Sequence, residues 1–420
     1  MEVILKPGSI FRQAKDIGVI WATEEAAKLG FRSGDPDWVN LGQGEPEVGE
    51  LKNGSPRVTT FLSEPQDFRY GPVNGMEPLR KAIADHYNRL YRKDKSSQYT
   101  AQNVSIVMGG RLALTRIFCS IGSIRLGYKT PEYPAYEDLL NNQAGRIIPV
   151  KIPTREKNNF AIPPAEFATA ITNHNLDAFL FSNPCNPTGH VVRDLALQSY
   201  LRTAKENQCA LIVDEVYSHY IYESGPSSGK PVSAAEFVED VDVDQVLIVD
   251  GLTKSFRCPG WRLAWVLGPK EMIEDLGRAS SGIDGGPSMP IQRAALQMLK
   301  PQWVDPEMTA LRAEFGKKQI LMIESIRQNG MSCSEDANST FYVWADIRKL
   351  PPPLNHASTF FTAMLREKVI TIPGTIFDIH PGVGEKGTPF NQYIRLSFGP
   401  EKENMKKGLA RITSLINAHR

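Results

Sequence analysis

The sequence is poor in cysteine and contains no long apolar run. Its five cysteines are scattered over 420 residues and form no CxxC pair, which argues against a disulfide framework or a zinc site. No stretch approaches the ~18 apolar residues of a membrane-spanning helix, and the N-terminus lacks the charged start and apolar run of a signal peptide. We therefore expect a cytoplasmic protein with no metal and no membrane partner.

Charge of either sign is not in excess. The chain has 48 Lys and Arg residues against 47 Asp and Glu residues, so its net charge is +1, and the basic residues form no block. This balance gives no electrostatic reason to expect a nucleic-acid partner. The length exceeds what one ordinary core accommodates, so the sequence predicts two lobes.

Short apolar runs alternate with helical stretches through the middle of the chain. Each run is about as long as a strand and rich in Val, Ile, Leu and Phe, which suits strands buried on both faces of a mainly parallel sheet. Helical periodicity between the runs indicates an α/β architecture with helices flanking the sheet. Ligands of such sheets bind beyond the carboxyl ends of the strands. The runs are 104–108, 177–181, 210–214, 245–250 and 263–268.

The chain after about residue 300 predicts a smaller α+β lobe. A long helical stretch over 308–330 precedes short strands and a further helix. The N-terminal forty or so residues are expected to join this lobe. The predicted division is an N-terminal segment that joins the small domain (1–48), a large domain (49–298) and a small C-terminal domain (299–420).

Polar side chains follow two of the predicted strands. Asp214 ends the run ALIVD, and Tyr217 comes three residues later. Lys254 lies just past the next run, in TKSFRCPGWR, and Arg262 lies eight residues further on. Asp214 alone would also suit a helix cap or a turn, and a lone lysine after a strand is usually a solvated charge. The compact context, with small hydroxyl residues beside Lys254, favours a built site.

A site for pyridoxal 5′-phosphate (PLP) needs these groups. A lysine amine of the protein forms a Schiff base with the cofactor, and a carboxylate keeps the pyridine nitrogen of the cofactor protonated. An arginine together with the N–H groups of a helix N-terminus binds the phosphate. Two further segments offer such groups. Asn186 lies in NPCNPTG, and Gly110 lies between a strand and a helix in VMGGRLAL. A simple turn explains the glycine pair equally well.

In its motifs the chain resembles the fold-type I PLP enzymes of the class I/II aminotransferase family. The matches occur in the family's order from about residue 40 to residue 399, with weaker ones in NLGQGEP, RYGPVNGMEPLRKAI and PEYPAY. The resemblance implies a PLP domain with a smaller α+β domain. The strongest matches are NPCNPTG (183–189), DEVYSHY (214–220), TKSFRCPGWR (253–262) and YIRLSFG (393–399).

The resemblance also implies roles at the cofactor ring. Lys254 matches the Schiff-base lysine that also moves the substrate's α-proton. Asp214 matches the partner of the pyridine nitrogen. Tyr217 and Asn186 match the donors to the cofactor's phenolic oxygen. Tyr133, in PEYPAY, matches the aromatic residue that stacks on the ring.

Further matches concern the phosphate and the substrate. Arg262 resembles the phosphate-binding arginine, and Gly110 and Arg111 match the backbone that cradles the phosphate. Arg395 resembles the arginine that clamps the substrate α-carboxylate, and Gly44 matches a backbone donor to the same group. Because Arg395 is charged between apolar neighbours, it must be paired or lie on an edge strand facing water.

Tyr70 resembles a tyrosine that reaches the phosphate of the other subunit. This match implies a homodimer with shared active sites. The small-molecule partners implied are an amino acid and a 2-oxo acid.

Some positions depart from the family's common pattern. Gly251 stands where a phosphate-binding serine is frequent, and Ala264 where glycine is common. Arg111 replaces a smaller residue, so it either supplies the missing phosphate contact or points to solvent. Glu47 and Glu50, in a segment that lines the family's substrate pocket, either meet a cationic substrate side chain or are solvated.

The motifs do not separate the reactions that begin with loss of the α-proton. Transamination between an amino acid and a 2-oxo acid is the first expectation. A PLP-dependent lyase or cyclase, acting for instance on an arginine-derived substrate, is the alternative. A PLP-binding regulator is a remote third reading, because only about forty residues precede NLGQGEP, too few for a helix-turn-helix module with its linker.

Overall fold

The computed structural model describes residues 18–222, 230–381 and 387–420; the first 17 residues of the expected N-terminal segment lie outside this part. Its centre is a seven-stranded sheet in the order β2-β8-β7-β6-β5-β3-β4. All neighbouring strands are parallel except at β8, which is antiparallel to both neighbours. The strands are β2 (Val104–Val107), β3 (Ile124–Lys129), β4 (Ile147–Ile152), β5 (Ala178–Ser182), β6 (Ala210–Asp214), β7 (Val246–Gly251) and β8 (Ala264–Leu267).

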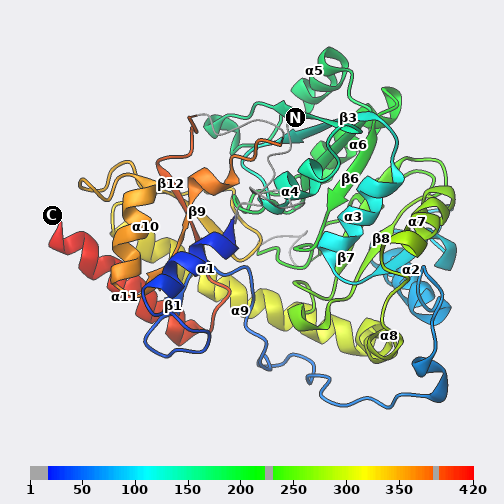
Figure 1. Ribbon diagram of the computed structural model, residues 1–420, viewed down its shortest axis with the longest axis horizontal. Helices are drawn as coiled ribbons and strands as arrows, with labels where there is room; N and C mark the ends of the chain where they lie inside the picture. The colour runs from blue at the N-terminus through cyan, green and yellow to red at the C-terminus, as the bar shows by residue number, and fades with distance from the viewer. Residues whose placement is uncertain (1–17, 223–229, 382–386) are drawn as a thin grey trace, which may run out of the picture.

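Helices cover both faces of this sheet (Figure 1). Successive strand residues pack into different cores: Phe179 and Phe181 face one set of helices, while Leu180 faces the other. The first set is α2 (Glu77–Tyr91), α5 (Pro164–His174) and α6 (Asp194–Glu206), and the second is α3 (Gly110–Ser120), α4 (Ala135–Asn141) and α7 (Lys270–Ile283). The mainly parallel α/β sheet expected from the apolar runs is therefore confirmed.

A second group of elements lies beside the large sheet. Its three-stranded antiparallel sheet has β12 in the middle, between β11 and β9, and β1 pairs with β10. Helix α9 runs between the two groups in Figure 1. The elements of this group are α1 (Val19–Lys28), β1 (Val39–Asn40), β9 (Tyr342–Asp346), α10 (Ala357–Arg366), β10 (Val369–Ile370), β11 (Ile372–Pro373), β12 (Tyr393–Ser397) and α11 (Lys402–Ala418), and α9 spans Pro301–Gln328. Helix α8 (Met289–Ala295) packs with α2 in the large-sheet group.

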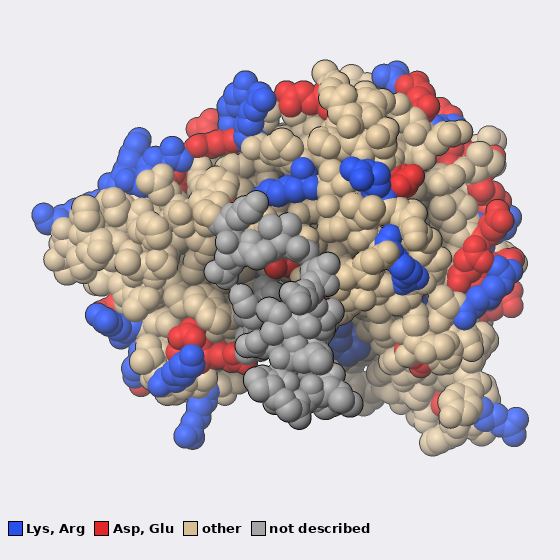
Figure 2. All heavy atoms as spheres, turned by 45° about the horizontal axis from the view of Figure 1, so that its top comes forward, with Lys and Arg blue, Asp and Glu red and all other residues tan. Residues whose placement is uncertain are grey.

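Surface charge is mixed on the face drawn in Figure 2, where basic and acidic side chains are interspersed. Across the described ranges, no helix combines the length and apolar character needed to cross a membrane.

Candidate active site

The carboxyl ends of β5, β6 and β7 meet at one edge of the large sheet, beside a cavity of about 530 Å³. Ten of the eleven predicted site residues line this cavity, although they come from seven separate segments of the chain. Tyr70 is the exception, because it is fully exposed and lies elsewhere. The ten are Gly44, Gly110, Arg111, Tyr133, Asn186, Asp214, Tyr217, Lys254, Arg262 and Arg395.

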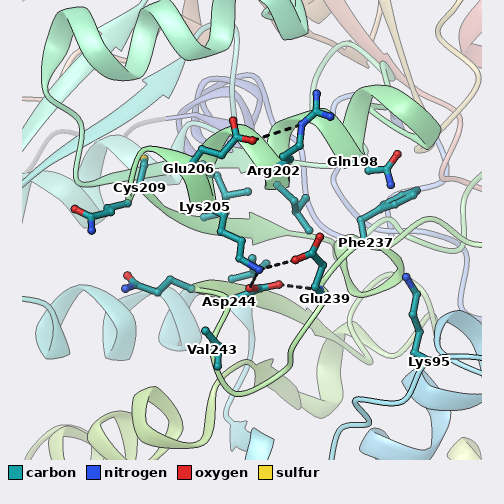
Figure 3. A pocket seen from close by; sticks show the side chains of 16 residues that line it. Lys95, Gln198, Arg202, Lys205, Glu206, Cys209, Phe237, Glu239, Val243 and Asp244 are labelled. Atoms are coloured by element: carbon teal, nitrogen blue, oxygen red, sulfur yellow. Dashed lines mark hydrogen bonds and ion pairs between the residues drawn. The ribbon is translucent and has the colours of Figure 1, made fainter.

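A larger cavity, of about 890 Å³, borders the opposite ends of β6 and β7 (Figure 3). Its central cation, Lys205, is already paired with Glu239 at 2.6 Å and with Asp244 at 2.9 Å. None of the predicted site residues lies there. The smaller cavity is therefore the candidate active site.

Lys254 reaches into the candidate site from the loop after β7. Its Nζ donates to the carbonyl oxygen of Gly44. Burial lowers the pKa of Lys254 to about 8, although the carboxylate of Glu45 opposes that shift. A substantial fraction of this amine is therefore neutral near physiological pH, as a nucleophile requires.

Asp214, the last residue of β6, is buried in the same cavity. The hydroxyl of Tyr136 donates to its Oδ2 at 2.8 Å. Burial raises the pKa of Asp214 to about 6 despite this bond. A protonated ring nitrogen beside Asp214 would reverse the cost of burying this charge.

Arg262 lies at the other side of the cavity and depends on a glycine that the sequence motif contains. Gly109 has φ of 91°, and a Cβ there would lie 2.1 Å from Nη2 of Arg262. Gly109 directly precedes helix α3, whose first N–H groups have no acceptor within the helix. The close approach thus places a guanidinium beside a helix N-terminus, which together suit a phosphate.

The departures at Gly251 and Ala264 belong together. The two residues are paired across β7 and β8, and a Cβ on Gly251 would lie 2.6 Å from Cα of Ala264. No side chain fits at position 251, so a serine hydroxyl there is excluded by packing. Thr253, two residues later, lines the cavity instead.

The Arg111 side chain contacts another predicted site residue, Tyr133. Its Nε donates to the hydroxyl of Tyr133 at 2.9 Å, and its guanidinium carbon lies 5.8 Å from the centre of that ring. The side chain is solvent-accessible but lines the cavity. It therefore fixes the aromatic residue expected to stack on the ring.

Arg395 is fully buried in β12, the central strand of the small sheet, so the alternative of an edge strand facing water is wrong. Its Nη1 donates to Oδ1 of Asn186 at 2.8 Å. Its guanidinium carbon lies 4.1 Å from the ring centre of Tyr342 and 5.0 Å from that of Phe377. Its Nε is buried without a hydrogen-bond partner among the described residues. This oriented cation suits a planar carboxylate.

Sequence reasoning missed Tyr342 and a supporting ion pair. Tyr342 lines the cavity in the strand STFYVWAD, where an apolar pattern gives no signal for a site. Lys129 pairs with Glu132 at 3.1 Å, and both are buried. Glu132 accepts from the hydroxyl of Ser182, whose oxygen accepts from the N–H of Asn186 at 3.2 Å. A buried carboxylate thus supports the loop that carries Asn186.

Glu47 and Glu50, for which the sequence left open either contact with a cationic substrate or solvation, do not line the cavity. Glu47 is paired with the chain's own Lys318 at 2.5 Å. Glu50 is exposed, and its Oε1 accepts from the N–H of Arg57 at 3.4 Å. Glu47 and Glu50 therefore give no support for an arginine-derived substrate, which was the substrate named for the cyclase alternative.

Comparison with known proteins agrees with this geometry. The model of the family "Aminotransferase class I and II" matches residues 36–412. The chain belongs to this family. Its members use PLP and transfer amino groups, so the protein is a PLP-dependent aminotransferase acting on an amino acid and a 2-oxo acid. The family expected from the motifs is confirmed.

Individual relatives of this aminotransferase are distant. Aspartate/prephenate aminotransferase of Thermus thermophilus is 26% identical over 93% of this chain and 94% of its own length. LL-diaminopimelate aminotransferase of Halothermothrix orenii is 27% identical over 90% of each chain. The solved structure of Thermus thermophilus aspartate aminotransferase with maleate superposes with a TM-score of 0.78, at 23% identity over 96% of this chain and 97% of that one. This superposition supports the fold.

The aminotransferase's own residues fit the cofactor. A buried carboxylate with a raised pKa, a lysine with a lowered pKa and an arginine beside a helix N-terminus meet in one cavity. Each of these three features matches one part of PLP: ring nitrogen, aldehyde and phosphate.

Proposed function

We propose that this aminotransferase carries out amino transfer in the cavity of Lys254, with the roles that the sequence predicts for its ten lining residues. The observation that carries the proposal is the meeting of Lys254, Asp214 and Arg395 around one cavity. When bound, PLP supplies a ring that withdraws electrons from the substrate's α-carbon. The protein must hold the cofactor, orient the substrate and move one proton.

Lys254 is the residue we assign to covalent attachment of the cofactor and to proton movement. Its neutral amine would remove the proton from the substrate's α-carbon and deliver it to the cofactor carbon that takes part in the transfer. Asp214 keeps the ring nitrogen protonated through its negative charge. Tyr217 and Asn186 donate to the phenolic oxygen, and Tyr133 stacks on the ring.

The phosphate is assigned to Arg262 and to the N-terminus of α3, where the N–H groups of Gly110 and Arg111 would donate to it. Arg395 is assigned to the substrate α-carboxylate, with Asn186 holding one of its nitrogens and the N–H of Gly44 donating to the same carboxylate. Because Arg395 contacts two rings and donates to Asn186, it meets the carboxylate with little loss of side-chain freedom.

We also propose that the enzyme is a homodimer in which Tyr70 reaches the partner's phosphate. Tyr70 is fully exposed, and its neighbours Phe68 and Leu62 are 85% and 89% exposed. Their segment, between β1 and α2, runs along the lower edge of Figure 1. Such an apolar group on an extended segment suits a protein interface. We further propose that the domain boundaries lie at residues 48/49 and 298/299 and that the enzyme is located in the cytoplasm.

The decisive test is single turnover of the purified enzyme loaded with PLP. Aspartate is the first amino donor to try, because several relatives are named for it. The proposal expects loss of the visible cofactor absorbance together with one equivalent of 2-oxo acid, and no reaction in Lys254→Ala. Release of ammonia or of a side-chain fragment would instead support the lyase alternative, and an active Lys254→Ala variant would overturn the assignment.

The dimer is tested separately. Sedimentation of the wild type should give twice the chain mass. Mixing inactive Tyr70→Ala and Lys254→Ala chains under conditions that exchange subunits should restore part of the activity, because one mixed site then has both residues. A monomeric active enzyme would refute the shared site.

A further inference from the structure

The segment of residues 44–58, which we call the strap, leaves the cavity directly after its contact with Lys254. It begins at Gly44, whose carbonyl oxygen accepts from Nζ of Lys254, and it contains no helix or strand. A segment without regular structure is fixed only by what its backbone and side chains contact. The contacts of the strap therefore determine where Gly44 meets the lysine.

Arg257 supplies the central contact. It lies three residues after Lys254, and its N–H donates to the carbonyl of Lys254 at 2.8 Å. Its side chain is completely buried. Nη1 donates to two strap carbonyls, those of Glu47 at 2.8 Å and Gly49 at 2.7 Å. The loop that carries Lys254 thus holds the strap directly.

An arginine of the strap, Arg57, also binds the backbone of the loop that carries Lys254. Arg57, near the far end of the strap, donates from Nη2 to the carbonyl of Arg257 at 2.8 Å and from Nη1 to that of Phe256 at 3.2 Å. Each segment therefore sends a guanidinium to the backbone of the other. Reciprocal bonds of this kind fix the register of two irregular segments, because neither can slide without losing several hydrogen bonds.

Helix α9 anchors both segments. Oε1 of its Glu307 accepts from Nε and Nη2 of Arg257 at 2.9 and 2.6 Å. Lys318 lies further along the same helix. Its Nζ donates to the carboxylate of Glu47 at 2.5 Å. The N–H of Glu47 donates to Gly399, which follows β12, at 2.8 Å. Glu47 thus joins the lysine loop, α9 and the strand of Arg395.

Stability alone does not account for this buried cluster. Replacing a buried ion pair by apolar side chains of similar volume is often neutral or stabilising. A buried ion pair can be retained because it selects one arrangement of the segments that it joins. The arrangement selected here brings the predicted carboxylate donor, Gly44, to the predicted cofactor lysine.

We propose that Arg257, held by Glu307, is a positioning residue that fixes the strap and thereby sets the place of Gly44 beside Lys254. The proposal rests on the assignment of Lys254 as the cofactor lysine. Arg257 does not line the cavity, so it acts through the strap. Its loss should loosen Gly44, weaken substrate binding and change the surroundings in which the lysine amine titrates.

The test uses a double variant, Arg257→Met/Glu307→Leu, in which neither partner of the central pair is left as an unpaired buried ion. It also removes the contacts of Glu307 with two strap residues, the N–H of Ser55 at 3.3 Å and the guanidinium of Arg57 at 3.7 Å, so the single variant Arg257→Met is measured beside it. The matched control is Arg116→Met/Asp284→Leu. In that pair Arg116 is also fully buried and binds its carboxylate at 2.9 and 2.6 Å, but it belongs to α3 and donates to the carbonyl of Ile106 in β2 rather than to the strap. Both variants lose one buried arginine–carboxylate pair, so effects of general destabilisation appear in both.

Three quantities are measured on the holoenzyme. Hydrogen exchange reports the peptide that covers residues 44–50, a pH titration of the cofactor absorbance reports the lysine, and steady-state kinetics separates KM from kcat. We expect strap exchange to rise at least about ten-fold, because two hydrogen bonds from a charged donor are lost. We also expect KM for the amino donor to rise about ten-fold and the absorbance midpoint to move, with all three near wild type in the control.

Equal strap exchange in the two variants, with unchanged KM and midpoint, would overturn the inference. Should the double variant fail to fold, Arg257→Lys keeps the charge but cannot reach all three acceptors, and the same measurements apply. Borohydride reduction followed by peptide mass mapping separates the two proposals. Cofactor found away from Lys254 refutes the proposed function, whereas cofactor on Lys254 with an unaffected strap refutes only the role of Arg257.

Discussion

The hydroxyl oxygens of Tyr217 and Tyr342 lie 2.8 Å apart inside the cavity, and both side chains are buried. Tyr217 comes from the segment after β6, and Tyr342 begins β9 of the small sheet. The ring of Tyr342 also lies beneath the guanidinium of Arg395, at 4.1 Å. One tyrosine therefore contacts both the predicted cofactor donor and the predicted substrate arginine.

Replacing Tyr342 by Phe should affect catalysis more than substrate binding. The variant keeps the ring under Arg395 but removes the hydroxyl partner of Tyr217, a loss of about 1 kcal/mol for a buried hydrogen bond. We expect kcat to fall about five-fold with KM little changed in steady-state assays. Tyr342→Leu also removes the cation–π contact, worth about 1–2 kcal/mol when desolvated, and should raise KM. Equal kinetics for Phe and Leu would contradict this division.

The sequence predicted five of the seven strands of the large sheet and ten of the residues that line the site, because these parts leave local signals. Each of the five predicted apolar runs overlaps a strand of the large sheet; Asp214 ends one of these strands and Lys254 follows another. Strands β3 and β4 gave no such signal. β3 contains Arg125, Gly127 and Lys129, and β4 contains a proline and a lysine, so neither forms a continuous apolar run.

Contacts between distant segments could not be predicted in this way. Glu47 and its partner Lys318 are 271 positions apart, and nothing near either residue identifies the other. Tyr342 was missed for a related reason, since its neighbours in the strand are typical core residues. A single sequence records which side chains are present at a strand end, but pairing across segments arises only when the chain folds.

Asp214→Asn should stabilise the enzyme freed of cofactor while weakening its hold on PLP. The pKa of Asp214 is raised to about 6 by burial, compared with 3.8 for the free side chain. Because the pKa of this carboxyl is higher in the folded protein than in the unfolded chain, the folded state is favoured while the carboxyl is protonated. This contribution to the free energy of unfolding is complete below about pH 4 and is lost as the pH rises to about 6. The variant should therefore be more stable at pH 7 by roughly 3 kcal/mol, and the difference should vanish near pH 4.

Thermal or urea unfolding of the cofactor-free proteins between pH 4 and pH 8 measures this difference. Wild-type protein loaded with PLP provides the comparison, because a protonated ring nitrogen pairs with the carboxylate and removes the cost of its burial. An Asp214→Asn protein without cofactor that is less stable than wild type at pH 7 would contradict the argument. So would PLP affinity equal to wild type.

Arg111→Ala should weaken retention of PLP. The variant loses the 2.9 Å hydrogen bond to Tyr133 and a cation beside the predicted phosphate site, while the backbone N–H of residue 111 remains. We expect Kd for PLP to rise about ten-fold, the equivalent of one charge-assisted hydrogen bond, in a fluorescence titration. Tyr133→Phe removes the same hydrogen bond but keeps the cation, and should have the smaller effect. Unchanged affinity in Arg111→Ala would exclude both contributions.

Covalent capture of PLP by the cofactor-free enzyme should accelerate as pH rises through about 8. The pKa of Lys254 is lowered to about 8, first of all by burial, and only the neutral amine is a nucleophile. Below pH 8 the protonated form dominates and capture slows about ten-fold for each unit of pH, whereas an ordinary lysine would still accelerate up to pH 10. Stopped-flow absorbance from pH 6.5 to pH 10 gives this profile. Because the carboxylate of Glu45 raises the pKa of Lys254, Glu45→Gln should move the midpoint to lower pH; an unchanged midpoint would show that the charge of Glu45 does not act on this amine.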